Sequence, residues 1–255
     1  MAAPQTALHV VLACAATLAA GLAAARPAAA GPAATHEVFG SRIADSRNSG
    51  PVIGRYQTDE GGTFVLDRSN PHPLLKFEDS PEVWGLQPTP GPRGDTIYRN
   101  DLGEPMVRAT RIGGMTVFTE TRPDGSAAAL ESASPPIRIA ALSPQALFNR
   151  FYQASVRASR AAEHQVAFET AQDAEPATAA AIADAALVAS EAITDMSSRP
   201  DTRRVLAHIN DVMIAQGDHP AAALQGKRLT ITIVPSQGVF GRPSSRRIER
   251  AAGAH

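Results

Sequence analysis

Four charged residues in one short stretch are the clearest candidates for chemistry, namely Arg93, Asp95, Arg99 and Arg108. The segment Asn100–Gly103 has Asn first and Gly fourth, which is typical of a type I turn with a glycine bulge and predicts a hairpin. Pairing the two strands outward sets Asp95 opposite Arg108 and Arg99 opposite Glu104 on one face. Two interpretations follow: cross-strand ion pairs, or a polar patch that binds an anionic ligand.

Other combinations that could support catalysis are weak. The histidines are scattered, and no pair has the spacing of a helical zinc site. A phosphate-binding loop and a serine nucleophile elbow are both missing from the sequence. The sequence therefore predicts no cofactor and no metal. A hydrolase would have to assemble its site from distant residues, with Asp95, His164 or His208 as participants.

Residues 51–134 carry the pattern of short strands, and these strands must position the four charged residues. Strand-like runs separated by turn signals recur at intervals typical of an all-β unit. The sequence predicts an antiparallel meander, or a small barrel or sandwich. The predicted strands are Val52–Thr58, Thr63–Arg68, Leu74–Phe77, Glu82–Leu86, Thr96–Arg99, Pro105–Ile112 and Met115–Thr121.

Residues 135–236 change to a helical period. Ser143 and the proline after it predict an N-cap and the start of a first helix. Further helices are expected over Thr178–Met196 and Asp201–Gln216. The alternating run Arg228–Val234 predicts one amphipathic strand. One strand cannot form a sheet alone, so we expect it to return to the N-terminal sheet and make one α+β unit with about three helices.

Charge is separated along the second half. Seven acidic residues and no Lys or Arg lie between Ala161 and Met196, whereas residues 242–250 contain four arginines and one glutamate. The pattern favours a solvated helix face followed by a flexible basic tail over 237–255. The alternative is that the tail docks on the acidic helices or on an acidic envelope surface.

The first thirty residues have the pattern of an export signal. Ala7–Ala25 is uncharged and apolar, and small-residue triplets end at Ala25 and Ala30. We expect cleavage after Ala30 or Ala25, a linker over 31–50, and a periplasmic or secreted protein without a membrane span. The alternatives are an uncleaved anchor, or a lipoprotein through Cys14, the only cysteine. The residues before Cys14 do not suit lipidation.

A block of short motifs between Gly54 and Phe118 resembles a known family. The runs are Gly-Arg-Tyr-Gln (54–57), Phe-Val-Leu-Asp-Arg (64–68), Pro-Leu-Leu-Lys-Phe (73–77), Pro-Glu-Val-Trp (81–84), Pro-Gly-Pro-Arg-Gly-Asp (90–95), Tyr-Arg-Asn-Asp-Leu-Gly (98–103) and Arg-Ala-Thr-Arg-Ile-Gly-Gly (108–114). Together they resemble uncharacterised bacterial envelope proteins known only as a domain of unknown function. The resemblance implies export and a bacterial source, but no activity and no site residues.

These observations limit the function classes. A net charge of −1 argues against a general nucleic-acid binder. The sequence predicts an exported envelope protein that acts as a non-catalytic binding or assembly module. Its partner would be an envelope protein or an anionic ligand, and its oligomeric state is not indicated. The alternative is a periplasmic hydrolase whose site lies between sheet and helices.

Overall fold

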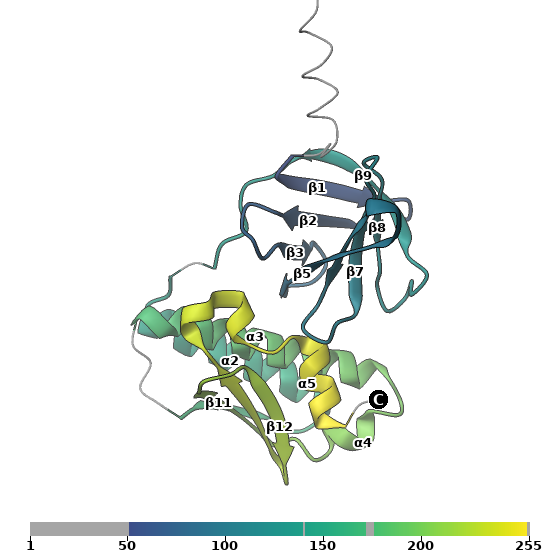
Figure 1. The fold of residues 1–255 in the computed structure, drawn as a ribbon. Coiled ribbons are helices and arrows are strands. Elements are labelled where there is room, and N and C mark those ends of the chain that lie inside the picture. The colour runs from purple at the N-terminus through teal and green to yellow at the C-terminus, as the bar shows by residue number, and fades with distance from the viewer. Residues whose placement is uncertain (1–50, 140, 172–175, 254–255) are drawn as a thin grey trace, which may run out of the picture.

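The structure is a computed structural model that describes residues 51–139, 141–171 and 176–253 (Figure 1). The predicted signal peptide over 1–30 and linker over 31–50 lie outside the described residues. Export and the cleavage site therefore stay predictions.

The first half is one antiparallel sheet in the order β4-β3-β2-β1-β9-β8-β7-β6-β5. The two edge strands are consecutive in sequence and are joined by Leu86, so the sheet curves back on itself into a nearly closed barrel (Figure 1). This is the coarse arrangement that the sequence predicts for 51–134. The strands are β1 (Ile53–Thr58), β2 (Thr63–Asp67), β3 (Leu74–Phe77), β4 (Val83–Gly85), β5 (Gln87–Pro90), β6 (Thr96–Arg99), β7 (Pro105–Ala109), β8 (Met115–Val117) and β9 (Ser126–Ala133).

Alternating side chains from these strands fill the barrel. Phe64 and Leu66 are two positions apart on β2 and both are fully buried, as period-two alternation requires. Leu75 and Met106 reach the same core from β3 and β7. The ring of Tyr56 stacks on Phe64 with 5.4 Å between centroids. The barrel therefore has a packed apolar core of its own.

Two strands of the barrel lack a strand-like sequence. β9 has the sequence Ser-Ala-Ala-Ala-Leu-Glu-Ser-Ala, whose composition favours a helix. It is a strand because it pairs with β1 on one side and β8 on the other. β5 contains Pro88 and Pro90 and lies at the sheet edge, where a missing backbone N–H is tolerated. Tertiary pairing outweighs local preference in both strands.

The predicted hairpin forms, but with a different register. Gly103 has a φ of 79°, and its N–H donates to the Asn100 carbonyl at 3.0 Å. Ile97 lies opposite Arg108, whereas the sequence predicts Met106 at that position. Asp95 therefore does not lie directly opposite Arg108, nor Arg99 opposite Glu104, although Asp95 and Arg108 still form an ion pair. The cause is a bulge between Tyr98 and Arg99, which shifts the pairing on the two sides of it.

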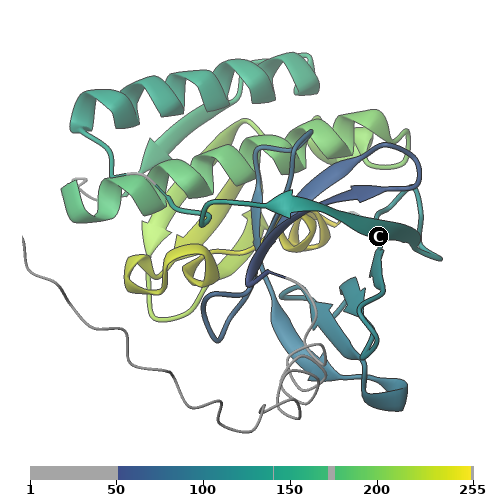
Figure 2. The same ribbon diagram turned by 90° about the horizontal axis from the view of Figure 1, so that it is seen from above.

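The second half has its own mixed sheet in the order β10-β11-β13-β12. Its strands are β10 (Ala167–Thr170), β11 (Asp211–Gln216), β12 (Ala221–Gln225) and β13 (Arg228–Ile233). Helices α2 (Pro144–Ala162) and α3 (Pro176–Ser198) lie side by side (Figure 2). The predicted N-cap is present, since the Ser143 hydroxyl accepts from the Ala146 N–H at 3.2 Å. The helix expected over Thr178–Met196 lies within α3.

Two details of the second half differ from the prediction. The helix expected over Asp201–Gln216 is wrong, because this stretch contains the short α4 (Arg203–Leu206) and then β11. Val212 and Ile214 are buried at period two, and β11 pairs in parallel with β10 and β13, which supplies backbone partners on both edges. β13 is a strand as predicted, but it joins this second sheet instead of returning to the barrel, because β11 and β12 flank it.

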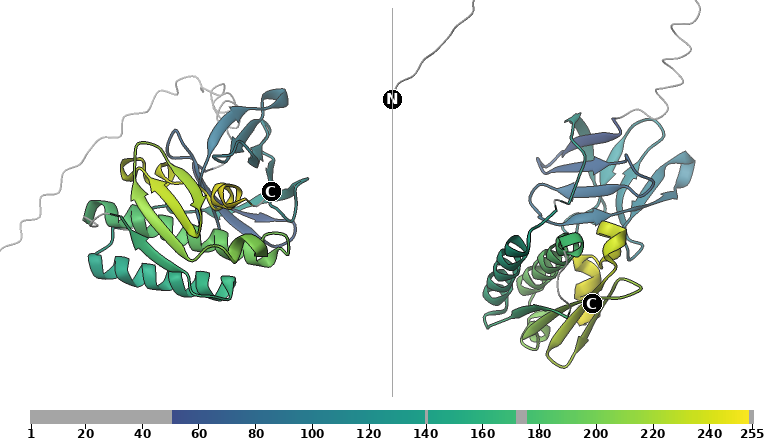
Figure 3. Two further views of the ribbon diagram at one scale, coloured as in Figure 1. Left: turned by 90° about the horizontal axis from the view of Figure 1, so that it is seen from below. Right: turned by 90° about the vertical axis from the view of Figure 1, so that its left-hand side faces the viewer.

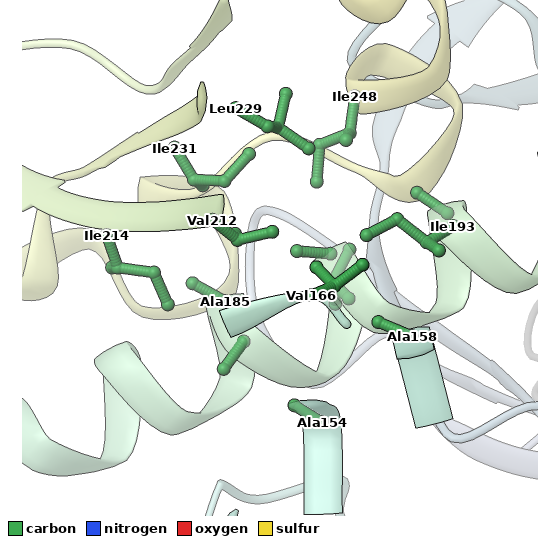
Figure 4. Close-up of a cluster of buried hydrophobic side chains, with 14 of the residues drawn as sticks. Ala154, Ala158, Val166, Ala185, Ile193, Val212, Ile214, Leu229, Ile231 and Ile248 are labelled. Carbon is green, nitrogen blue, oxygen red and sulfur yellow. The ribbon is translucent and has the colours of Figure 1, made fainter. Parts of the chain in front are cut away.

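The two halves bury separate apolar clusters. Figure 4 shows the second cluster, in which Val212, Leu229 and Ile231 from the sheet face Ile193 of α3. Ile248 enters the same cluster from α5 (Ser245–Ala252). The 3₁₀ segment η3 (Pro235–Gly241) and the helix α5 lie where the two halves meet (Figure 3). No described helix is long and apolar enough to cross a membrane.

Candidate functional site

The C-terminal segment, residues 235–252, differs from the flexible tail that the sequence predicts over 237–255. It folds as η3 followed by α5, and Ile248 is fully buried. The Ser244 hydroxyl caps α5 by accepting from the Arg247 N–H at 3.2 Å. The sequence does contain a sign of this helix, since Ile248 and Ala252 are four positions apart and lie on one apolar face. The surrounding arginines made that apolar face hard to recognise.

A tight turn places this segment against the barrel. The Val234 N–H donates to the Gly241 carbonyl at 2.7 Å and closes η3. A Cβ atom at Gly241 would lie 2.0 Å from the Val234 carbonyl oxygen, so no other residue fits there without a backbone shift. The chain then runs directly into Arg242 at the junction.

Arg242 is the centre of the junction. Its side chain is 4% exposed and forms ion pairs with Glu82 of the β half and Asp184 of α3. Arg242 Nη1 lies 3.3 Å from Glu82 Oε1, and Arg242 Nη2 donates to the Val83 carbonyl at 2.7 Å. A buried guanidinium needs such partners, because an unpaired buried charge is costly. Arg242 therefore links both halves to the C-terminal segment.

Glu82 is held from several sides. It is 1% exposed and accepts from the Ser245 N–H at 3.1 Å and from the Ser245 hydroxyl at 2.5 Å. Burial raises the pKa of Glu82 to about 7, although Arg242 and the Ser245 hydrogen bonds act to lower it. The junction thus contains a buried carboxyl group whose pKa lies above its usual range.

The remaining arginines of the segment pair with acids of the β half. Asp101 accepts from the Ser244 N–H at 3.1 Å and from its hydroxyl at 2.6 Å, with Arg247 at 3.6 Å. Glu104 pairs with Arg246 at 3.1 Å and Arg250 at 2.8 Å. The basic segment is therefore docked, as the alternative interpretation of the sequence predicts, but most of its ion pairs are with the barrel. Its contact with the acidic helix α3 is the ion pair between Arg242 and Asp184.

A cleft of about 500 Å³ opens beside this docked segment. The β half contributes His72, Trp84 and Gln87 to its wall, and the second half contributes Gln237, Phe240 and Arg247. This volume is in the range that holds a small ligand. We call this space the junction cleft.

The junction cleft combines aromatic surface with polar groups. The rings of His72 and Phe240 lie 5.1 Å apart between centroids, and Trp84 is the only tryptophan of the chain. Phe240 packs on the backbone of β4, since a Cβ atom at Gly85 would lie 2.6 Å from its ring. The Arg247 side chain is 41% exposed and can donate to a ligand. The site can therefore bind a ring on one face and its polar substituents at the edge.

The four residues singled out from the sequence lie elsewhere and only partly together. Arg108 Nε donates to Asp95 at 2.7 Å, and this hydrogen bond lowers the pKa of Asp95 below its usual range. Arg93 lies near enough to lower it further. Arg99 instead donates to the Gly103 carbonyl at 2.7 Å. The ion pair between Asp95 and Arg108 is present, whereas an anion-binding patch of all four residues stays a prediction.

The histidines considered for a hydrolase have structural contacts. The ring nitrogens of His164 lie 2.8 Å from the Ala162 carbonyl and 2.9 Å from the Ile209 carbonyl. His208 Nδ1 lies 2.7 Å from the Arg204 carbonyl. The hydrogen-bond partners of the Asp95 side chain are Arg108 and Arg111, so neither histidine is joined to it. Within the described chain, no group of three His, Cys, Asp or Glu residues could hold a metal ion.

Sequence reasoning missed the junction cleft because its residues come from positions between 72 and 247. The local signals were present but separate: a single tryptophan in the β half and an arginine cluster at the end of the chain. Nothing in one sequence states that Trp84 and Arg247 line the same cavity.

The family of the chain follows from comparison with known proteins. The family model described as "Domain of unknown function (DUF4908)" matches residues 36–252, so the chain belongs to this family. The resemblance found in the block 54–118 is thereby confirmed and extends through the second half. No curated protein and no solved structure matches the chain.

Proposed function

We propose that this protein is an exported, non-catalytic binding module of the bacterial envelope, and that the junction cleft holds a small carbohydrate. The observation that carries the proposal is the cleft itself, in which aromatic rings and hydrogen-bonding groups from both halves meet. The export signal predicted over 1–30 supports an envelope location.

A carbohydrate suits the cleft for chemical reasons. A sugar ring has an apolar C–H face that packs on an aromatic ring, and hydroxyls at its edge that both donate and accept. Phe240 offers the ring surface, while Gln87 and Gln237 each offer a donor and an acceptor. Arg247 adds further donors. An entirely apolar ligand would leave these polar groups without partners, which is costly on binding.

The docked segment gives the cleft a defined shape. Arg242, Ser244 and Asp101 all line the cleft, and all three hold the C-terminal segment on the barrel. A wall whose side chains are fixed in this way loses little conformational entropy when a ligand binds. A binding function therefore explains why the protein contains buried ion pairs despite the desolvation of their charges.

Titration of the mature protein with a panel of soluble envelope glycan fragments tests the proposal. Calorimetry should show saturable binding to one fragment class, and Gln87→Ala should weaken it. Gln225→Ala is a matched control, because Gln225 is an exposed glutamine on β12, outside the cleft. Equal binding by both variants, or no binding across the panel, would contradict the proposal.

A hydrolase is the second candidate, because the cleft does bring together a histidine and a carboxylate. His72 and Asp101 both line it, beside the Ser244 hydroxyl. Against this role, both Asp101 oxygens already accept from Ser244. Turnover of a panel of ester and glycoside substrates that is lost in His72→Ala would favour the hydrolase over the binding module.

A further inference from the structure

A second cavity lies at one end of the barrel and shares no lining residue with the junction cleft. Its volume is about 440 Å³. Arg68 at the end of β2 and Arg111 in the turn between β7 and β8 line it, together with Tyr56 and Tyr98 from inside the barrel. No Asp or Glu is among its lining residues.

Arg68 has no carboxylate partner among the residues that the structure describes. Across the described ranges, no carboxylate oxygen lies within 4.0 Å of its guanidinium, and its side chain makes one hydrogen bond, from Nη2 to the Pro51 carbonyl at 2.7 Å. Its Nε is buried and has no hydrogen-bond partner in the described ranges. The adjacent Asp67 does not compensate it, because its carboxylate accepts from Ser69 and Ile137. Cations in such positions are normally paired, so the Arg68 charge is uncompensated within the described part of the chain.

Arg111 adds a second cation at the rim. Its side chain lies against Gly94, where a Cβ atom would come within 3.4 Å of Arg111 Cδ. Its backbone N–H donates to Asp95 at 3.4 Å, but the guanidinium has no ion-pair partner within the described part of the chain. Asp95 is instead paired with Arg108. Two guanidinium groups thus line the cavity without a compensating acid.

Two tyrosines supply neutral donors. Tyr56 and Tyr98 are 4% and 7% exposed, and neither hydroxyl has a hydrogen-bond partner among the residues that the structure describes. The Tyr56 ring lies over Gly54, where a Cβ atom would come within 2.7 Å of it. Burial raises the pKa of Tyr56, and the nearby Arg68 charge acts against that rise. A phenolic hydroxyl can donate one hydrogen bond, so the two tyrosines add O–H donors to the lining of the cavity.

We propose that this barrel-end cavity binds a phosphate group. The shared chemistry of the lining is cationic and donor-rich, with two guanidinium groups and two phenolic hydroxyls. A phosphate monoester carries close to two negative charges near neutral pH, a phosphodiester carries one, and both have several acceptor oxygens that match these groups. The planar guanidinium of Arg68 suits bidentate contact with such an oxyanion. This site is independent of the carbohydrate function proposed for the junction cleft.

The test is calorimetric titration of the full mature chain with inorganic phosphate at low ionic strength. We expect Arg68→Gln to weaken binding about tenfold or more, as loss of a charge-assisted contact implies. Arg111→Gln should weaken it by about threefold, because that side chain is exposed. Arg204→Gln is the matched control, since Arg204 is exposed on α4 outside this cavity, and should bind as the wild type does.

Further arms separate the source of the phosphate. Glycerol 3-phosphate represents a soluble ester, and vesicles of anionic phospholipid represent a headgroup; binding of either that depends on Arg68 supports the site. If Arg68→Gln fails to fold, Tyr98→Phe and the phosphate-dependent rise in wild-type melting temperature, measured against chloride at equal ionic strength, replace it. No binding in any arm, or equal loss in Arg204→Gln, would overturn the proposal.

Discussion

Arg242 and Glu82 lie 160 positions apart in the sequence, and Arg242 Nη1 is 3.3 Å from Glu82 Oε1 at the boundary between the two halves. Each half has its own apolar core, so this pair and the hydrogen bonds around it define how the halves meet. Burying the two charges carries a desolvation cost that their attraction only partly offsets. The pair therefore fixes the position of the C-terminal segment, which contains Arg242 and forms one wall of the junction cleft.

Removal of the Arg242 charge should strongly destabilise the protein. In Arg242→Met, the buried Glu82 and the partly buried Asp184 would both lose their cation, and breaking a buried pair typically costs about 3–5 kcal/mol. The free energy of unfolding in urea measures the effect. Arg247→Met is the control, since its ion pair with Asp101 is partly exposed and should contribute little. The double variant Glu82→Gln/Arg242→Met should recover part of the loss; equal stability of wild type and Arg242→Met would contradict this account.

Asp195 should make stability fall between about pH 4 and pH 7. Burial, followed by repulsion from Glu249 and Glu191, raises the pKa of Asp195 to about 7. A folded-state pKa above the unfolded one means that the contribution is fully present below the unfolded pKa and is lost as pH rises through 7.

Asp195→Asn tests this directly. The variant should be more stable than the wild type at pH 8 by about 1–2 kcal/mol, a value reduced for partial solvent screening, and similar to it at pH 4. Thermal unfolding across this range measures the difference. Asp218→Asn, at an exposed position, should leave the pH profile unchanged. A less stable Asp195→Asn at pH 8 would show that the carboxylate is favourable in the fold.

Gly85 should be sensitive to a single methyl group. In Gly85→Ala the added Cβ would lie 2.6 Å from the Phe240 ring, so the ring must move away from β4. We expect a loss of about 1–3 kcal/mol, typical of overpacking, together with weaker ligand binding in the junction cleft. Phe240→Leu in the same chain removes the clashing ring and should restore much of the stability. If it does not, the strain lies elsewhere.

Export should remove the first residues of the chain. Mass spectrometry of the protein from a native host should give a mature N-terminus directly after Ala30 or Ala25. An intact Met1 would contradict cleavage, and a lipidated Cys14 would make the protein membrane-anchored instead of free.

The sequence predicts those parts of the fold in which local chemistry decides the outcome. The turn at Asn100–Gly103 and the N-cap at Ser143 follow from single residue types, and both are present. β11 could not be predicted, because its apolar residues also fit a helical period and only pairing with β10 and β13 decides between the two.

The candidate site could be predicted less well, because its contacts also depend on tertiary arrangement. The ion pair between Asp95 and Arg108 forms although the predicted register is wrong, because the long Arg108 side chain still reaches the Asp95 carboxylate. The docking of Arg242 on Glu82 depends on how two separate cores are placed, which no local pattern contains. The sequence shows which residues are charged, but not which of them form ion pairs with one another.

The most direct test of the central claim uses the fluorescence of Trp84. This residue is the only tryptophan and lines the junction cleft, so its emission reports on changes at that site. Titration of the mature protein with the glycan fragment that binds in calorimetry should give a saturable change in emission, with a midpoint that rises in Gln87→Ala and not in Gln225→Ala. Binding of the glycan without any change in Trp84 emission would place the ligand elsewhere and contradict the account.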